Sequence, residues 1–91
     1  MTQQEVLVEL RGLLVERLRF DPQRAGQASA ETILPKGLAG SLGLDSLDFI
    51  ELSAGIEERF GLVIDETEDL SAEFHSLDSL SRFVMTKLGP A

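Results

Sequence analysis

The chain has 91 residues, of which 16 are acidic and 8 are basic, so its formal net charge is −8 at pH 7. A chain of this length is expected to form one small domain over residues 1–91. The absence of cysteine excludes disulfides, thiolate metal sites and a cysteine nucleophile. The acidic balance argues against nucleic-acid binding, and no apolar run approaches the roughly 18 residues of a membrane span. No basic and apolar leader follows Met1, so we expect a cytoplasmic protein. The initial Met1 and the short tails favour a free-standing protein, which we expect to be a monomer.

The first predicted element is an amphipathic helix over residues 3–19. Apolar residues recur at helical spacing, at Val6, Leu10, Leu13, Leu14 and Leu18. Thr2 can cap this helix, with Glu5 three places on completing a capping box. We expect the helix to end at Asp21-Pro22, because a residue before proline is disfavoured in the α region.

Residues 21–44 are predicted to form a long loop between the first two longer helices, because prolines and glycines interrupt any regular pattern there. We expect residues 23–30 to be its mobile part. Scattered apolar residues further on indicate that the rest of the loop is pinned onto a core. They are Ile33, Leu34, Leu38, Leu42 and Leu44.

The second longer helix is predicted over residues 46–60, with Asp45 as its N-cap and Asp48 in its first turn. Gly61 supplies a left-handed stop. Gly55, in the middle of the helix, costs about 1 kcal/mol unless close packing requires it.

Residues 66–72 are expected to form one or two helical turns, and a last helix is expected over residues 76–88. No pair of strands is indicated. The predicted fold is all-α, a small bundle of three longer helices plus one short helix.

The helix at residues 46–60 carries two apolar stripes where an amphipathic helix needs one. The first predicted stripe faces the core and consists of Phe49, Leu52, Ile56 and Phe60. The second is rimmed by acids and consists of Leu47, Ile50 and Ala54. An apolar surface with a charged rim is typical of a partner-docking surface. The alternative is one broad core face that covers both stripes.

The net charge is concentrated in residues 45–69, which hold nine acids and a single cation, Arg59. The remainder of the chain sums to zero. Such a patch should steer basic protein surfaces toward it, and added salt should weaken the effect.

Residues 38–48 form a motif at the start of the helix at residues 46–60. The apolar Leu38 is followed after three places by Leu42-Gly43 and, after one further place, by Asp45-Ser46-Leu47-Asp48. This motif resembles the attachment motif of the acyl carrier protein family, of the discrete fatty-acid or polyketide type. The resemblance continues through Glu51-Leu52, Ile56 to Glu58, Phe60 and Ile64, and covers about residues 5–88.

The resemblance implies that Ser46 receives 4′-phosphopantetheine from coenzyme A through a phosphopantetheinyl transferase, with Asp45 and Leu47 in supporting roles. The first position of a helix suits a phosphate, because unpaired amides and the helix dipole attract anions. The implied function is to carry acyl groups as thioesters between loading, synthase and transferase enzymes with basic docking surfaces, without catalysis by the chain itself. The predicted docking residues are Leu47, Asp48, Ile50, Glu51, Ala54, Glu57, Glu58 and Ile64.

A second Asp-Ser-Leu sequence, Asp78-Ser79-Leu80, lacks the preceding Leu-Gly. Ser79 falls in the first turns of the last helix, capped by Ser76, so we interpret this copy as structural. His75, the sole histidine, is interpreted as a loop residue. The acidic run 65–69 lacks the ligand alternation and glycine of an EF-hand loop, and we predict no metal site.

Several positions depart from the family pattern and favour polyketide or related specialised metabolism over fatty-acid synthesis. They are Gly40 and Ser41, where many fatty-acid carriers have acids, Phe49, Gly55, and a longer segment between Ile64 and Phe74. One alternative is a peptidyl carrier of a nonribosomal peptide pathway, which usually has Gly-Gly-His-Ser or Gly-Gly-Asp-Ser at its attachment site. Another is an acidic interaction or cation-binding module without a prosthetic group.

Overall fold

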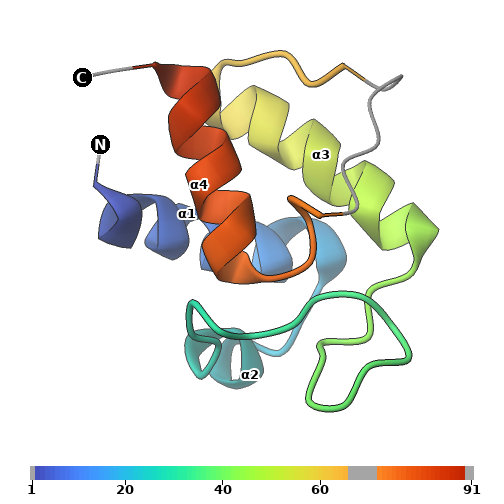
Figure 1. Ribbon diagram of the computed structural model, residues 1–91. Helices are drawn as coiled ribbons and strands as arrows, with labels where there is room; N and C mark the ends of the chain where they lie inside the picture. The colour runs from blue at the N-terminus through green and yellow to red at the C-terminus, as the bar shows by residue number, and fades with distance from the viewer. Residues whose placement is uncertain (1, 66–71, 90–91) are drawn as a thin grey trace.

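The computed structural model describes residues 2–65 and 72–89. In this part of the chain four helices follow one another, α1 (Gln3–Leu18), α2 (Pro22–Gly26), α3 (Ser46–Phe60) and α4 (Leu77–Leu88), as Figure 1 shows. Between them lie isolated bridges, Ile33 with Ser76 and Pro35 with Leu44. The predicted all-α class is confirmed. None of these helices is long and apolar enough to cross a membrane.

Helix α1 begins as predicted and ends earlier than predicted. Thr2 and Glu5 form the capping box, and the hydrogen bond from the Thr2 amide lowers the pKa of Glu5. The helix stops at Leu18 because Arg19 takes a left-handed conformation, with φ of 57°. Asp21-Pro22 therefore does not end α1. It starts α2, with the Asp21 carboxylate accepting from the Gln23 amide and Pro22 in the first turn.

The structure contains a short helix that was not predicted, α2. Residues 21–44 were expected to form a loop throughout, with residues 23–30 mobile, yet α2 occupies its first part. Ala25 and Ala28 are buried and fasten this segment to the core. Of the short helix expected over residues 66–72, all but the last residue lie outside the described residues, and Ala72 lies in a turn.

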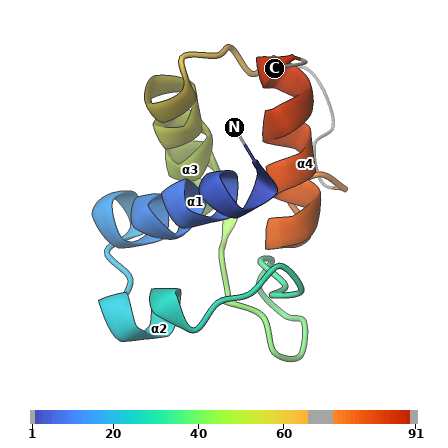
Figure 2. The same ribbon diagram turned by 90° about the vertical axis from the view of Figure 1, so that its left-hand side faces the viewer.

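The core lies where α1 packs against both α3 and α4, while α3 and α4 contact each other less. Figures 1 and 2 show α2 and the following loop together at one end of these three helices. The largest fully buried apolar side chains come from all three longer helices and from the loop. They are Val6, Leu10, Leu13, Leu14, Leu34, Leu44, Leu52, Ile56, Leu77, Leu80 and Val84.

Gly55 of α3 packs closely against Leu13 and Arg17 of α1. A Cβ atom at this position would lie 3.0 Å from Leu13 Cδ2 and 3.1 Å from Arg17 Cγ. Both distances are shorter than ordinary carbon contacts. Close packing therefore accounts for a glycine in the middle of a helix.

Candidate functional site

The loop that leads to Ser46 is held by backbone hydrogen bonds. The amides of Leu42 and Leu44 donate to the carbonyls of Ile33 and Leu34, each at 2.9 Å. Leu44 is buried, and Gly43 has a φ of 76°, which suits glycine. The predicted pinning of the loop is confirmed for Leu34, Leu42 and Leu44, whereas Leu38, also expected to pin it, is 47% exposed. The chain therefore enters α3 from a fixed position two residues ahead of Ser46.

Helix α3 spans the predicted residues 46–60, and its start is capped as predicted. The Asp48 amide donates to the Asp45 carboxylate at 2.9 Å, and the Asp45 amide donates to Asp48 at 3.1 Å. Ser46 is the first residue of the helix, and it is exposed. Within the described residues, no carbonyl or side chain accepts from the amides of Ser46 and Leu47. An exposed hydroxyl beside unpaired amides at a helix start fits the attachment of a phosphate ester.

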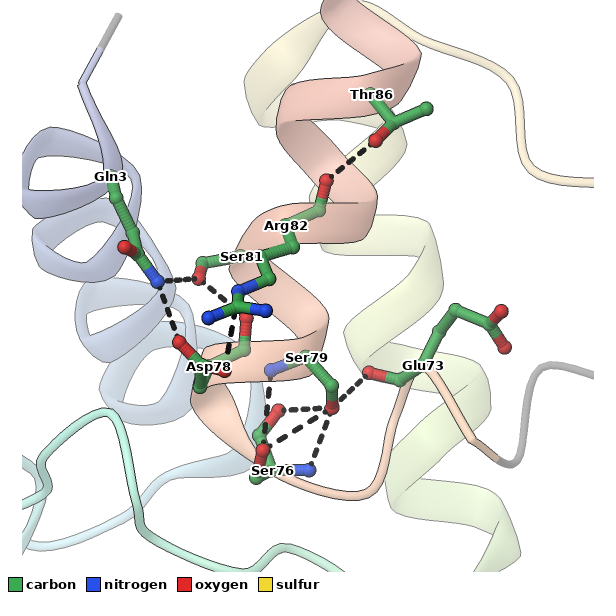
Figure 3. A network of polar contacts seen from close by, with 8 residues as sticks. All are labelled: Gln3, Glu73, Ser76, Asp78, Ser79, Ser81, Arg82 and Thr86. Carbon is green, nitrogen blue, oxygen red and sulfur yellow. Dashed lines mark hydrogen bonds and ion pairs between the residues drawn. The ribbon is translucent and has the colours of Figure 1, made fainter.

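The second Asp-Ser-Leu sequence has the opposite environment, as Figure 3 shows. The Ser79 hydroxyl donates to the carbonyl of Glu73 at 2.8 Å and accepts from the Ser76 amide at 3.1 Å. The Ser79 amide in turn donates to the Ser76 hydroxyl. The amides of Asp78 and Leu77, the two residues before Ser79, donate to the carbonyls of Ala30 and Thr32, respectively. Ser79 thus has a structural role at the start of α4, as predicted, and its hydroxyl is engaged in the capping box.

The two predicted stripes of α3 differ in burial. Leu52 and Ile56 are fully buried, and Phe49 and Phe60 pack against the core from half-buried positions. In contrast, Leu47 is 73% exposed and Ile50 is 65% exposed. Ala54 is half-buried. Exposure of the two large side chains contradicts a single broad core face.

The predicted docking acids make contacts that the sequence did not reveal. Glu51 and Glu58 both form ion pairs with Arg17 of α1. The half-buried Glu57 accepts a hydrogen bond from the Ile64 amide at 3.0 Å, which holds the turn after α3. Asp48 is engaged in the capping box. Of the predicted acids, Glu51 and Glu58 are the most exposed.

Arg59, the only cation among residues 45–69, forms no ion pair with these acids in the described part of the chain. It pairs with Glu9 and Glu16 of α1, and the hydrogen bond to Glu9 raises its pKa. The charge of the acidic patch is therefore moderated by Arg17, a residue distant in sequence.

The prediction that Ile64 belongs to the docking surface disagrees with the structure. Ile64 is 6% exposed and part of the core, whereas Val63 is 78% exposed. Residues 62–64 are all apolar, so their sequence gives no indication of which one points outward. Val63 was missed for the same reason.

His75 is exposed, and its carbonyl accepts from the Leu34 amide at 2.9 Å, as suits a loop residue. Over residues 2–65 and 72–89, no three histidine or acidic side chains gather in a way that could hold a metal ion. The acidic run 65–69 lies outside the described residues except for Asp65.

Comparison with known proteins agrees with the geometry of this site. The family model described as "Phosphopantetheine attachment site" matches residues 8–84. An acyl carrier protein of Thermosynechococcus vestitus is 31% identical over 87 residues, which is 92% of this chain and 98% of the relative. The acyl carrier protein of Treponema pallidum is 30% identical over 84 residues, 92% of this chain and 96% of its own. "Aminoacyl carrier protein 1" of Bradyrhizobium diazoefficiens is 36% identical over 64 residues, 70% of this chain and 71% of its own.

Over most of its length the chain is thus similar in sequence to acyl carrier proteins and matches a phosphopantetheine-attachment family, and it presents a helix start suited to a phosphate ester. Members of this family interact with phosphopantetheinyl transferases and synthase enzymes. The chain belongs to the acyl carrier protein family, as a carrier without catalytic activity of its own whose covalently attached cofactor is 4′-phosphopantetheine.

Proposed function

We propose that the 4′-phosphopantetheine is attached to Ser46, on a single domain that spans the chain. The observation that carries the proposal is the contrast between the two Asp-Ser-Leu sequences. The Ser46 hydroxyl is exposed beside unpaired helix amides, whereas the Ser79 hydroxyl is engaged in a capping box. When bound, the group supplies a terminal thiol on which acyl groups are carried as thioesters.

In the attachment step, Ser46 Oγ forms a bond to the phosphorus on the pantetheine side of coenzyme A. The bond from this phosphorus to the bridging pyrophosphate oxygen breaks, and adenosine 3′,5′-bisphosphate leaves. The hydroxyl proton passes to a base of the transferase. Amides at the start of α3 stabilise the charge of the resulting phosphodiester.

Asp45 and Leu47 support this step in different ways. Asp45 fixes the start of α3 through the capping box, which holds the backbone of Ser46 at the first position of the helix. Leu47, next to Ser46 and 73% exposed, offers an apolar contact to a partner that reaches the arm.

Peptide mapping tests the assignment. The protein is incubated with coenzyme A and a broad-specificity transferase, digested, and analysed by mass spectrometry. The added mass is expected on the peptide that contains Ser46. An adduct on another peptide, or no adduct, contradicts the proposal, and the second result favours an acidic interaction module.

The docking surface proposed for basic partners consists of Leu47, Ile50, Ala54, Glu51 and Glu58, to which Val63 is added. Two exposed apolar side chains beside exposed carboxylates form the apolar centre and charged rim of an interface. Asp48 and Glu57 contribute charge to this face while also serving the fold.

The pathway proposed for this carrier is polyketide or related specialised biosynthesis. The support is that Gly40, Ser41 and Phe49 differ from the residues usual at these positions in fatty-acid carriers. The likeness to a protein called aminoacyl carrier protein favours a second candidate, loading with an amino acid by an adenylating enzyme. Loading assays on the modified protein separate the two. Acylation by an acyltransferase with acyl-coenzyme A donors supports the first, and aminoacylation with ATP and an amino acid supports the second.

A further inference from the structure

Two clusters of ion pairs join α1 to α3. In each cluster an arginine of one helix lies over a glycine of the other helix and pairs with two acids that flank this glycine. On α3, Gly55 lies one turn from Glu51 and one turn from Glu58, so the three residues share one stripe of the helix. Arg17 lies across this glycine, because a Cβ there would be 3.1 Å from Arg17 Cγ and 3.6 Å from its Nε. The missing side chain lets one guanidinium reach both carboxylates.

The reciprocal cluster lies on α1, where Gly12 separates Glu9 from Glu16. Arg59 of α3 lies over this glycine, with its Nη1 3.7 Å from the position of a Cβ, and pairs with both acids. The side chains of the two arginines are similarly exposed, at 29% for Arg17 and 31% for Arg59. They differ in place, since only Arg17 engages acids of the proposed docking surface.

We infer that Arg17 is an intramolecular competitor for the basic residues of partner enzymes, and so a determinant of how tightly partners bind. The inference rests on the proposed function, because it takes the phosphopantetheinyl transferase as the partner. Glu51 and Glu58 are 48% and 68% exposed in their ion pairs, so a partner cation can approach them from solvent. To gain their full charge, it must displace Arg17.

The cost of this displacement is small, because exposed ion pairs are weak and are screened by salt. Removing Arg17 is therefore expected to strengthen partner binding by about two- to five-fold at low ionic strength, the factor that corresponds to one weak pair. The chemical step at Ser46 should not change, because Arg17 contacts Glu51 and Glu58 and not the helix start.

Transferase kinetics on Arg17→Gln and Arg59→Gln test the inference, since both variants lose one positive charge and one cross-helix clamp. Arg17→Gln should lower the apparent KM for the carrier two- to five-fold at low salt with kcat unchanged, and Arg59→Gln should leave both constants unchanged. High salt should abolish the difference. With Glu51→Gln and Glu58→Gln already in place, Arg17→Gln should have no further effect.

An equal fall in KM for both arginine variants would mean that net charge alone causes the effect, and it would overturn the inference. An unchanged or raised KM for Arg17→Gln would overturn it as well. Arg17→Met keeps an apolar stem over Gly55 and must give the same fall, so that loss of packing is separated from loss of charge. A wild-type protein that gains no mass at Ser46 overturns the proposed function itself, and with it the partner invoked here.

Discussion

At the scale of single residues, the two Asp-Ser-Leu sequences differ in where they lie relative to the N-cap of their helix. Asp45-Ser46-Leu47 and Asp78-Ser79-Leu80 both begin a helix, but the capping residue differs. In the first the aspartate is the N-cap, and the serine hydroxyl stays exposed. In the second Ser76 is the N-cap, and Ser79 completes the box. The shift of the cap by two residues decides which serine remains available.

The two serines should therefore contribute differently to stability. Ser79→Ala removes hydrogen bonds to Glu73 and Ser76 in a half-buried position, so it should cost about 1–2 kcal/mol of the free energy of unfolding. Ser46→Ala should change it by less than about 0.5 kcal/mol, because this side chain is exposed. Urea denaturation of the two variants measures both values, and equal losses would contradict the assignment of Ser79 to the capping box.

The two stripes of α3 provide a second pair of matched substitutions. Leu52 is 1% exposed, so Leu52→Ala should cost about 2–4 kcal/mol through lost burial and a cavity. Leu47→Ala should cost less than about 1 kcal/mol, yet it should slow transfer of the arm by the transferase.

Denaturant melts and transferase kinetics are measured on the same two proteins. A loss of stability in Leu47→Ala as large as that in Leu52→Ala would place Leu47 in the core and remove it from the docking surface.

At the scale of the helices, the α1–α3 crossing depends on its two glycines in different ways. At Gly12 a methyl group meets only Arg59 Nη1 at an ordinary distance of 3.7 Å, so Gly12→Ala should stabilise the protein by about 0.5–1 kcal/mol. At Gly55 the same methyl group meets Leu13 at 3.0 Å, and the resulting strain should cancel or reverse this gain.

Thermal or urea unfolding of the two alanine variants gives the comparison. The free energy of unfolding of Gly55→Ala should fall below that of Gly12→Ala by about 1 kcal/mol or more. An equal gain at both positions would show that α1 and α3 are not in close contact at Gly55.

Helix boundaries could be predicted where a local signal sets them. Thr2, Asp45 and Ser76 cap the helices they were expected to cap, and Gly61 ends α3 with a φ of 67°. Helix α2 could not be found by periodicity, because five residues make little more than one turn. Asp21-Pro22 can either stop a preceding helix or start a following one. We predicted a stop, and the structure uses it as a start.

Only part of the candidate site could be predicted from the sequence. Ser46, Leu47 and Ile50 were identified from the motif and the helical spacing, and the structure leaves all three exposed. The pairing of Arg17 with Glu51 and Glu58 depends on how α1 crosses α3, which no local pattern encodes. Burial of Ile64 instead of Val63 depends likewise on how the chain turns after α3.

At the scale of the whole molecule, the chain is small and strongly acidic. Its radius of gyration is 12.0 Å, close to the about 12 Å typical of a compact chain of this length. A domain of this size has only a few kcal/mol of net stability, so its interaction residues are best placed where they contribute little to the core. The exposed Leu47, Ile50 and Glu51 meet this condition.

Charge reversal on this face tests its role in association. Glu51→Lys should slow modification by the transferase at low salt, mainly through a higher apparent KM, and added salt should shrink the difference from wild type. Glu31→Lys makes the same change in net charge on an exposed loop residue and should have little effect. Equal slowing in both variants, or none in Glu51→Lys, would exclude docking on α3.

The intact mass of three proteins tests the central claim most directly. Wild type, Ser46→Ala and Ser79→Ala are each incubated with coenzyme A, magnesium and a broad-specificity phosphopantetheinyl transferase, after circular dichroism has shown that each is folded. Wild type and Ser79→Ala should gain the mass of one phosphopantetheine group, and Ser46→Ala should gain none. A mass gain that persists in Ser46→Ala would contradict the assignment of Ser46 as the attachment residue.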